Sequence, residues 1–596
     1  MKMKNILKYI ALVAIIAFCA SSCEKFLDRP AEDSYTTANY YQNDMQVEQA
    51  VNYLYNSPWH DVRRFYIYGS ETMCGNVYQS NNAYGTLTVN GTDEDLVYMA
   101  YSLWAVNSHC NTVINNILNS TGSASKAVKS KSIGEALAWK AMAYFMLVRT
   151  FGDIPIIHDN TEVIKEATYN EQSKVAKEDV YEYIIMTLEK AMELLPKDPY
   201  IGKYNRIDYY AAEGLLSKVY LAKAGVTGTL NNEDLKKAKD YAKDVIDNSG
   251  RSLTPKYSDV FRLQPTLFQQ TGENLFSWLW TSTSSQWTSG NAIQSDVALT
   301  GFSEFGDIWG DWKGPTIDLQ DAFGVSAIED PELRVNNDDR RKVTMMMFGD
   351  KYDYFWVDRG GFDFYRFFYD DTYYPVGLES NGSNHDWCCQ TGANYGKHIW
   401  GCGADHIAAL GFNAARMASQ LPTHILRLSD VYLIYAEACV LTGDSGNALT
   451  YVNKVRERAN AKPLASVTFN DVWKERRLEL ALEGDRWYDF VRRSYYDMDA
   501  CIAELKAQRR SHWDGINAVY KSYVVDDEGK YVGPGAHKWD KSTIVYNNED
   551  DLVDVKPSMF TVPFPTEDVV MNPKVGSTSE PIRLNVRETF SYDYNI

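Results

Sequence analysis

Glutamates at a four-residue spacing form the first group of side chains suited to chemistry. Glu475, Glu479 and Glu483 would share one face of a helix, near Arg476, Arg477 and Arg486. Carboxylate pairs act as acid and base in glycosidic hydrolysis, but they do so from opposite sides of a cleft. Side chains three and four positions apart on a helix instead form ion pairs. We therefore interpret this group as structural and predict no catalytic residue.

Histidines and cysteines form a second group. His398, Cys402 and His406 follow Cys388 and Cys389, but the spacing lacks the CxxC pair of zinc sites. Thiols of an exported protein tend to form disulfides, and the pairing among these three cysteines stays open. The acidic runs 90–96 and 335–341 lack the ligand spacing of a calcium-binding EF-hand, so we expect solvated turns there. The sequence contains no GxSxG, phosphate-binding glycine loop or HExxH, and we expect no metal and no cofactor.

Aromatic side chains in irregular segments form a third group, which suits a sugar ligand. Aromatic residues make up 13% of the chain, and 42 of them are tyrosines. Trp and Tyr stack on the C–H faces of sugar rings, while Asn and Asp bond the hydroxyls. The predicted ligand-binding residues are Tyr78, Tyr84, Trp287, Trp309, Trp312, Trp356 and Trp387, with Asn81, Asn82 and Asp311 as hydrogen-bonding neighbours.

Packing in the core is the alternative for each of these aromatics, because large aromatic side chains are mostly buried. Four other tryptophans lie in segments with helical periodicity, where packing already accounts for them. They are Trp104, Trp139, Trp473 and Trp487. We expect these four in the core.

The N-terminus has the pattern of a secretory signal. Lysines up to Lys8 precede an apolar run over 10–18 and three small residues before Cys23. The run is shorter than the roughly 20 apolar residues that cross a bilayer, which disfavours a permanent transmembrane anchor. The residues before Cys23 resemble the lipobox of bacterial lipoproteins, which implies removal of the signal peptide 1–22 and acylation of Cys23. The net charge of −19 excludes nucleic acid as a partner.

Helical periodicity marks two parts of the chain that must position these groups. Apolar residues recur every three or four positions over 133–150, 180–195, 209–224, 235–247, 424–441 and 447–458. Gly152 and Pro155 end the first of these segments. The pairing of such segments resembles tetratricopeptide hairpins with irregular spacing. The region 251–423 is instead rich in loops, with short strands expected near 274–280 and 352–357, and 526–563 is also irregular.

Several blocks together resemble the SusD/RagB family of Bacteroidetes outer-membrane nutrient-binding lipoproteins. They extend over nearly the whole chain, and their order and spacing are more specific than any single block. The blocks are CEKFLDRP after the lipobox, GEALAWKAMAYFMLVRTFGDIP at 134–155, LP at 195–196, RIDYYAAEGLLSKVYLA at 206–222, LRLSDVYLIYAEA at 426–438, NKVRERA at 453–459, ERRLELALEGDRWYDFVR at 475–492 and PFPTEDVVMNP at 563–573.

The resemblance implies a mainly α fold in which tetratricopeptide-like helix hairpins pack against a loop-rich lobe with a few short strands. We expect one domain over 23–596, with helical portions at about 40–250 and 424–510 and the ligand-binding lobe at about 251–423 and 511–596. The resemblance to the SusD/RagB family also implies a lipid-anchored protein on the cell-surface side of the outer membrane. Such a protein captures a nutrient glycan without chemistry and delivers it to a SusC-type TonB-dependent transporter. A lipoprotein glycoside hydrolase and a helical-repeat scaffold for peptide or protein are the alternatives.

Overall fold

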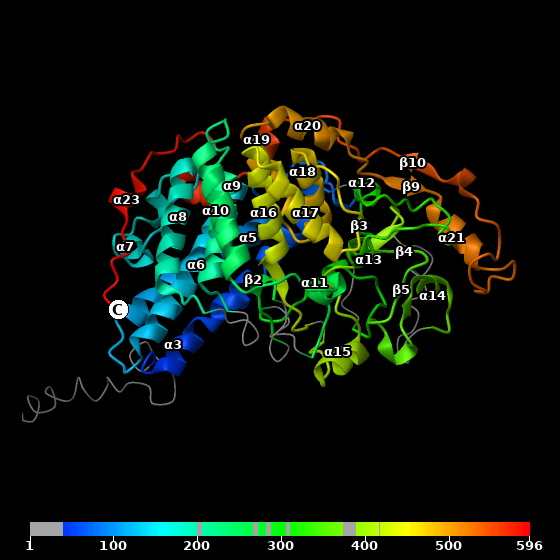
Figure 1. The fold of residues 1–596 in the computed structure, drawn as a ribbon, viewed down its shortest axis with the longest axis horizontal. Coiled ribbons are helices and arrows are strands. Elements are labelled where there is room, and N and C mark those ends of the chain that lie inside the picture. The colour runs from blue at the N-terminus through cyan, green and yellow to red at the C-terminus, as the bar shows by residue number, and fades with distance from the viewer. Residues whose placement is uncertain are drawn as a thin grey trace, which may run out of the picture.

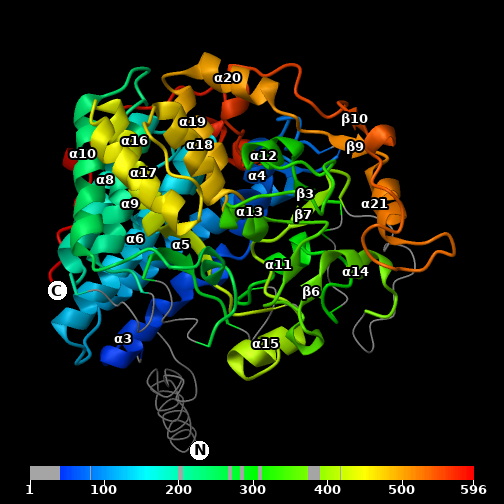
Figure 2. The ribbon, with the colours of Figure 1, turned by 45° about the vertical axis from the view of Figure 1, so that its right-hand side comes forward.

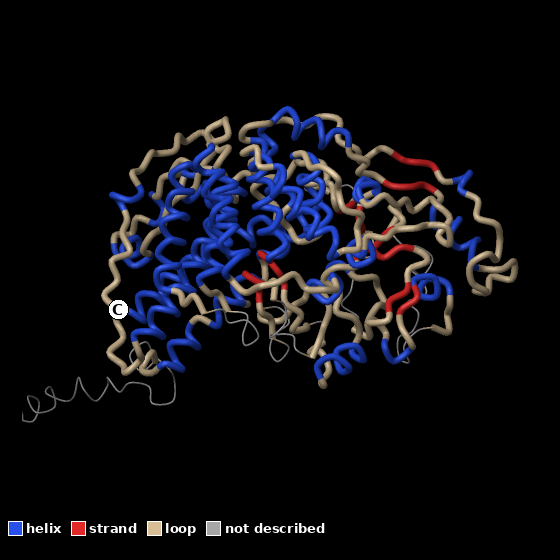
Figure 3. The backbone as a smooth tube through the Cα atoms, viewed as in Figure 1, coloured by secondary structure: helices blue, strands red, loops and turns tan. Residues whose placement is uncertain are grey.

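Helices dominate the computed structural model, as the sequence predicts, and its strands are few and short (Figures 1 and 3). The structure describes residues 40–80, 82–198, 206–265, 272–281, 288–305, 310, 312–373, 389–416 and 418–596. The helices are α3 (Asp44–Ala50), α4 (Ser70–Met73), α5 (Glu94–Leu118), α6 (Lys126–Phe151), α7 (Asn160–Lys165), α8 (Lys177–Leu194), α9 (Tyr209–Lys223), α10 (Asn232–Asn248), α11 (Ile293–Val297), α12 (Ile317–Ala322), α13 (Asp339–Thr344), α14 (Phe364–Tyr369), α15 (Gly403–Leu410), α16 (Leu428–Leu441), α17 (Ser445–Arg458), α18 (Phe469–Leu480), α19 (Arg486–Ser494), α20 (Met498–Ala507), α21 (Ile516–Val524), α22 (Thr566–Met571) and α23 (Val586–Thr589).

The strands form two-stranded antiparallel pairs in the described part of the chain. They are β1 (Val77–Tyr78) with β3 (Gly314–Pro315), β2 (Asn274–Trp278) with β8 (Thr423–Arg427), β4 (Met345–Met347) with β7 (Ala393–Tyr395), β5 (Lys351–Tyr352) with β6 (Phe362–Asp363), and β9 (His512–Asp514) with β10 (Val545–Asn547). Such short ladders are too small to hold together alone, so each depends on packing against its surroundings.

Consecutive long helices pack side by side in one half of the molecule, and the strands and loops fill the other (Figures 1 and 2). Helices α5, α6, α8, α9 and α10 contact one another in chain order, and α10 then packs against α16, which packs against α17. This order confirms the predicted helix hairpins. Helices of 15 to 26 residues gain most of their stability from such packing, because isolated helices are marginal in water.

Helix ends follow the residues that cap them. Ser125 caps the start of α6, and the helix stops at Gly152, whose φ of 74° suits a residue without a side chain. Asp208 accepts a hydrogen bond from the amide of Ala211 at the start of α9. Asp93 and Asp338, from the two acidic runs, cap α5 and α13 in the same way, so these carboxylates serve helix termini.

One predicted helix start is wrong. The segment 424–427 is the end of strand β8, and α16 begins only at Leu428. The strand pairs with β2, where Ser277 lies opposite His424 and Trp278 opposite Thr423. Nonlocal pairing therefore overrides an apolar pattern that is also compatible with a helix.

The C-terminal stretch also departs from expectation. Residues 511–596 are expected in the loop-rich lobe, but the chain returns to the helices after about 556. The Phe560 ring stacks on Trp487, with centroids 5.6 Å apart, and the Val562 amide donates to the Thr150 carbonyl at 3.0 Å. The hydroxyl of Tyr592 lies 2.8 Å from that of Thr187 on α8. About the last 40 residues of the chain therefore pack against the helical half.

A single cluster of buried apolar side chains extends through both halves. Trp59 lies between Trp139 of α6 and Trp278 of β2, with ring centroids 4.9 and 5.7 Å apart. Of the four tryptophans expected in the core, Trp139, Trp473 and Trp487 are buried, and Trp104 packs partly buried against the core. Across the described residues, the search for a helix with the length and hydrophobicity of a membrane span finds none.

Candidate functional site

The β1–β3 ladder brings two of the predicted ligand-binding segments together. Val77 lies opposite Pro315 and Tyr78 opposite Gly314, so Trp312 stands two residues before the strand that pairs with the segment leading to Asn82. Trp312 is 47% exposed, which is high for a tryptophan. The next residue, Lys313, extends its ammonium over the Tyr68 ring, 5.5 Å from the centroid. Trp312 thus exposes its aromatic ring to solvent, while the β1–β3 ladder and the contact of Lys313 with Tyr68 hold the residues that follow it.

A small polar hollow lies beside this ladder. Its walls are Val77, Tyr78, Gln79, Asn82, Gly85, Thr86, Arg510 and Asp550. The Asn82 side chain accepts a hydrogen bond from the Tyr84 amide at 2.7 Å, which fixes its orientation. Amide, hydroxyl, guanidinium and carboxylate groups are the hydrogen-bonding partners that sugar hydroxyls require.

Tyr78 lines the hollow but is only 4% exposed. Its hydroxyl lies 3.1 Å from Nδ1 of His512 on β9, and burial raises the pKa of Tyr78. The phenol therefore stays protonated and supports the wall of the hollow. Its ring has no free face for stacking, so the expected stacking role of Tyr78 is wrong.

Two other predicted aromatics belong to the core. Tyr84 is 6% exposed, its ring packs on Phe65 with centroids 5.6 Å apart, and its hydroxyl donates to Asp93. Trp356 is fully buried, and its indole donates to the Phe302 carbonyl at 2.9 Å. The expectation that these rings face a ligand is wrong, because both are part of the buried apolar cluster that extends through both halves.

The remaining predicted residues lie outside the described part of the chain. These are Cys23, Asn81, Trp287, Trp309, Asp311 and Trp387. Described residues that adjoin two of these segments come close to Trp312: the Cys389 thiol lies 3.8 Å from the Trp312 carbonyl, and the amide of the next residue, Lys313, donates to the Gly310 carbonyl at 3.1 Å. The neighbourhood of Trp312 thus connects to the segments that carry Trp309 and Trp387.

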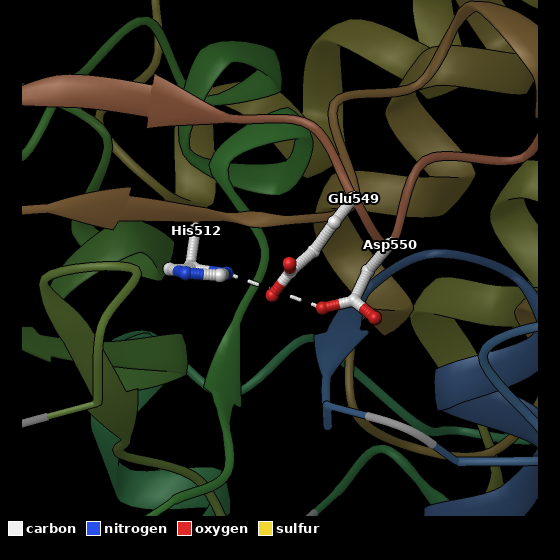
Figure 4. A group of neighbouring side chains, drawn as sticks. All are labelled: His512, Glu549 and Asp550. Carbon is white, nitrogen blue, oxygen red and sulfur yellow. Dashed lines mark ion pairs between the residues drawn. The ribbon is translucent and has the colours of Figure 1, made fainter.

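The His512 side chain points toward two carboxylates in the loop after β10 (Figure 4). His512, Glu549 and Asp550 each offer one possible metal-ligand atom, and these three atoms lie within 4.8 Å of one another. This is the only such trio that the described residues form. His512 Nδ1 already faces the Tyr78 hydroxyl and lies 4.0 Å from Asp550 Oδ2. We assign no metal here, because the histidine is engaged with the wall of the hollow.

The histidine and cysteine group of the central region does not converge on one point. His398 Nε2 lies 2.6 Å from the Leu482 carbonyl, whereas His406 Nδ1 lies 2.7 Å from the Phe412 carbonyl. Cys389 and Cys402 are both buried, and no disulfide joins these two described residues. Cys388 lies outside the described part. These residues therefore serve packing and backbone hydrogen bonding.

The glutamates at 475, 479 and 483 are structural, but their partners differ from those expected. Glu475 pairs with Arg340 and Arg456, both at 2.6 Å, and Glu479 with arginines from α13, β8 and α17. Arg476, which should have paired along the helix, instead contacts Asp430 at 2.7 Å. The group is a buried network between elements and not an exposed ladder.

Acid–base catalysis does not fit these carboxylates. Burial opposes ionisation of Glu479, but Arg458, Arg427 and Arg340 outweigh it and hold its pKa well below the usual range. Burial likewise opposes ionisation of Glu483, and Arg427 and Lys397 lower its pKa to about 2. A general acid needs a raised pKa. Both groups stay ionised and fully paired.

Sequence reasoning misses part of the hollow. Arg510, His512 and Asp550 come from the far end of the chain. They reach the site through the pairing of β9 with β10, the approach of His512 to Tyr78 and a hydrogen bond from Arg510 to the Met73 carbonyl at 3.1 Å. Their local sequence has no periodicity or motif that points to a ligand. Only the three-dimensional arrangement identifies them.

Comparisons with known proteins agree with this architecture. The family model described as "SusD family" matches residues 312–578, and that described as "Starch-binding associating with outer membrane" matches residues 25–221. A SusD-like protein of Bacteroides ovatus is 30% identical over 598 residues, covering 98% of this chain and 99% of the relative.

Solved structures extend the comparison. A crystal structure with a xylogluco-oligosaccharide has a TM-score of 0.72 and 27% identity, covering 90% of this chain and 99% of that one. A laminarin-binding SusD-like protein has a TM-score of 0.59 and 17% identity over 89% of this chain and 98% of that one. The second match shows the shared fold alone.

Proposed function

The chain belongs to the SusD family, and on that basis we propose that it binds a nutrient glycan without altering it. The observation that carries the proposal is the exposed ring of Trp312, which stands two residues before β3, the strand that pairs with the β1 wall of the polar hollow. A flat aromatic face next to hydrogen-bonding groups suits a neutral sugar ring, which offers C–H faces and hydroxyls together. The similar structure that holds a xylogluco-oligosaccharide supports a β-glucan as the first ligand to test.

The ligand-binding surface we propose is centred on Trp312. Trp287, Trp309 and Trp387 supply further stacking positions, and Asn81, Asn82 and Asp311 supply hydrogen bonds, with Gln79 and Arg510 added from the hollow. Loops hold this surface, as is usual for binding sites positioned by a rigid scaffold. The ion pairs of Glu479 and Glu483 belong to that scaffold.

Attachment and delivery complete the proposal. We propose that Cys23 carries acyl chains, which fix the protein on the outer face of the outer membrane, and that the protein passes its glycan to a SusC-type TonB-dependent transporter. The matching description "Starch-binding associating with outer membrane" supports the location. More than one acyl chain makes such an attachment durable.

A panel of polysaccharides separates binding from catalysis. Purified protein should be retarded in gels that contain its glycan, with xyloglucan and laminarin among the first tested, and it should release no reducing ends during long incubation. Release of reducing ends by the pure protein would replace the proposal with a glycoside hydrolase. Absence of retardation by every glycan, with intact fold by circular dichroism, would favour a peptide or protein ligand.

A further inference from the structure

A second cavity lies apart from the Trp312 surface and shares no lining residue with the hollow at β1. It measures about 680 Å³ and is walled by residues of 256–258, of α13 and of 351–373, which includes the β5–β6 hairpin. Ligand pockets of drug-sized molecules measure roughly 300–1,000 Å³, so the cavity has room for one or two sugar units. In Figure 1, β5 and α14 lie below β3 and β4, and in Figure 2, β6 and α14 lie below β3 and β7.

Cationic side chains outnumber carboxylates in the lining of this cavity, although Asp358 and Asp370 beside it pair with Arg359 and Arg366. Five cationic side chains line it, Lys256, Lys342, Lys351, Arg359 and Arg366. Three carboxylates face them, Asp339, Asp353 and Asp363. The lining therefore carries a formal surplus of two positive charges on a chain whose net charge is −19. A concave positive site on an acidic protein concentrates anions.

Two of the cations have no carboxylate partner in the described structure. Lys351 pairs with Asp363 at 3.0 Å, and Arg366 pairs with Asp370 at 2.8 Å. Within the part of the chain that the structure describes, no carboxylate lies within ion-pair distance of Lys256, and the Lys342 ammonium contacts the Tyr352 ring, 5.1 Å from its centroid. Their charge is available to a ligand.

Arg359 is held in place by an unusual turn. Trp356, Gly360 and Gly361 all have positive φ, of 54°, 78° and 109°. The turn leaves the Arg359 guanidinium 5.2 Å from the centroid of the Trp356 ring and 3.3 Å from the Tyr373 carbonyl. Its Nε is buried without a hydrogen-bond partner. Its Nη2 pairs with Asp358 at 3.3 Å, and because Asp358 is 43% exposed this pair is weak, so an anion in the cavity can compete for the guanidinium.

We propose that this cavity is a second sugar-binding site, selective for saccharide units that carry a negative charge. The carboxylate of a uronic acid or the sulfate ester of a sulfated sugar binds against Lys342, Lys256 and Arg359, and the sugar ring packs on Tyr354, an aromatic residue of the lining that is only partly buried. The site is independent of the Trp312 surface. It would let the protein recognise acidic side groups of a glycan whose neutral backbone binds elsewhere.

Calorimetry on the full mature chain with the Trp312→Ala substitution tests this proposal, because that background removes the first surface. The probes are trigalacturonate, the neutral galactotriose of the same linkage, and galactotriose sulfated at O6. Either acidic probe should bind about tenfold or more tightly than the neutral one, as expected for charge-assisted hydrogen bonds, and added salt should weaken it. The tighter of the two acidic probes identifies the anion.

Substitutions assign the binding to the cavity. Lys342→Gln combined with Arg359→Gln should abolish the preference for the acidic probes. If this double variant misfolds, Lys342→Gln alone should still reduce the preference. The matched control removes two exposed lysines outside the cavity, Lys530→Ala with Lys541→Ala, and should change nothing. Equal binding of acidic and neutral probes, no binding of any probe, or an unchanged preference in the folded Lys342→Gln variant would overturn the proposal.

Discussion

Replacement of Trp312 by alanine should weaken glycan binding while leaving the fold intact. The side chain is 47% exposed, and its backbone is held by the β1–β3 ladder two residues later. The substitution therefore removes a ring that faces solvent and opens no buried cavity. A stability change of under about 1 kcal/mol is expected, which is typical of surface positions.

The loss of affinity follows from the exposed area. A tryptophan side chain buries at most about 250 Å² when it is fully enclosed, so the exposed 47% of Trp312 amounts to roughly 100 Å². A sugar ring that stacks on one face covers about half of that, roughly 50 Å², together with a similar area of its own C–H face. At about 25 cal/mol per Å² the ring alone contributes about 1.3 kcal/mol, and ring and sugar together about 2.5 kcal/mol. The dissociation constant should rise about 10- to 70-fold.

Calorimetry with the oligosaccharide that is best retained in gels measures this change directly. Trp312→Phe should keep most of the affinity, because a flat apolar face remains. Tyr169→Ala is the matched control, since Tyr169 is also a highly exposed aromatic, at 60%, in the helical half. An unchanged affinity in Trp312→Ala, or an equal loss in Tyr169→Ala, would refute the assignment of the binding surface.

Four further predictions test the scaffold and the anchor. Glu479→Gln should cost about 3–5 kcal/mol in urea unfolding, because it leaves buried arginines such as Arg427 without their charge partner; a cost under about 1 kcal/mol would contradict the network. The pKa of Glu483 falls from 4.5 to about 2 on folding, so its stabilisation is complete above about pH 4.5 and disappears as the pH drops toward 2; thermal melting against pH should show this loss, and Glu483→Gln should flatten it in that window. Gly361→Ala should destabilise by about 1–3 kcal/mol, since its φ is 109° and the new Cβ would lie 2.8 Å from the Tyr352 carbonyl, whereas Gly529→Ala, with open space around it, should cost less. Cys23→Ala should abolish metabolic labelling by palmitate and release the protein from membranes, and persistent labelling would exclude this anchor.

Much of the helical half is predictable from local sequence. The segment 133–150 repeats its apolar residues with the period of a helix, and Gly152 can adopt the positive φ that ends it. The strand at 424–427 is not predictable in this way. Its short apolar run fits a strand or a helix equally well, and its partner β2 lies about 150 positions earlier in the chain.

The candidate site is predictable only in part. Trp312 and Trp356 both lie in irregular segments next to glycine and aspartate, yet one is 47% exposed and the other fully buried. The difference arises from contacts far away in sequence, since Trp356 donates its indole N–H to Phe302 and its amide to Asp405. A local pattern has no information about such partners. The composition indicates residue types that suit a sugar ligand, and the tertiary structure determines which of the aromatic side chains are exposed to one.

The helical half also explains why the exposed ring keeps its place. Arg477 of α18 donates to Asn76, the residue before β1, at 2.8 Å and to Asp318, just after β3, at 2.6 Å. One buried guanidinium thus ties both strands of the ladder beside Trp312 to the core. A two-residue ladder is too short to be rigid by itself, but a charged clamp from a packed helix restricts its motion. The arginines of this block, which a reading of one helix face takes for surface ion pairs, therefore serve binding indirectly, because a stacking platform that is already in position loses less entropy when a sugar arrives.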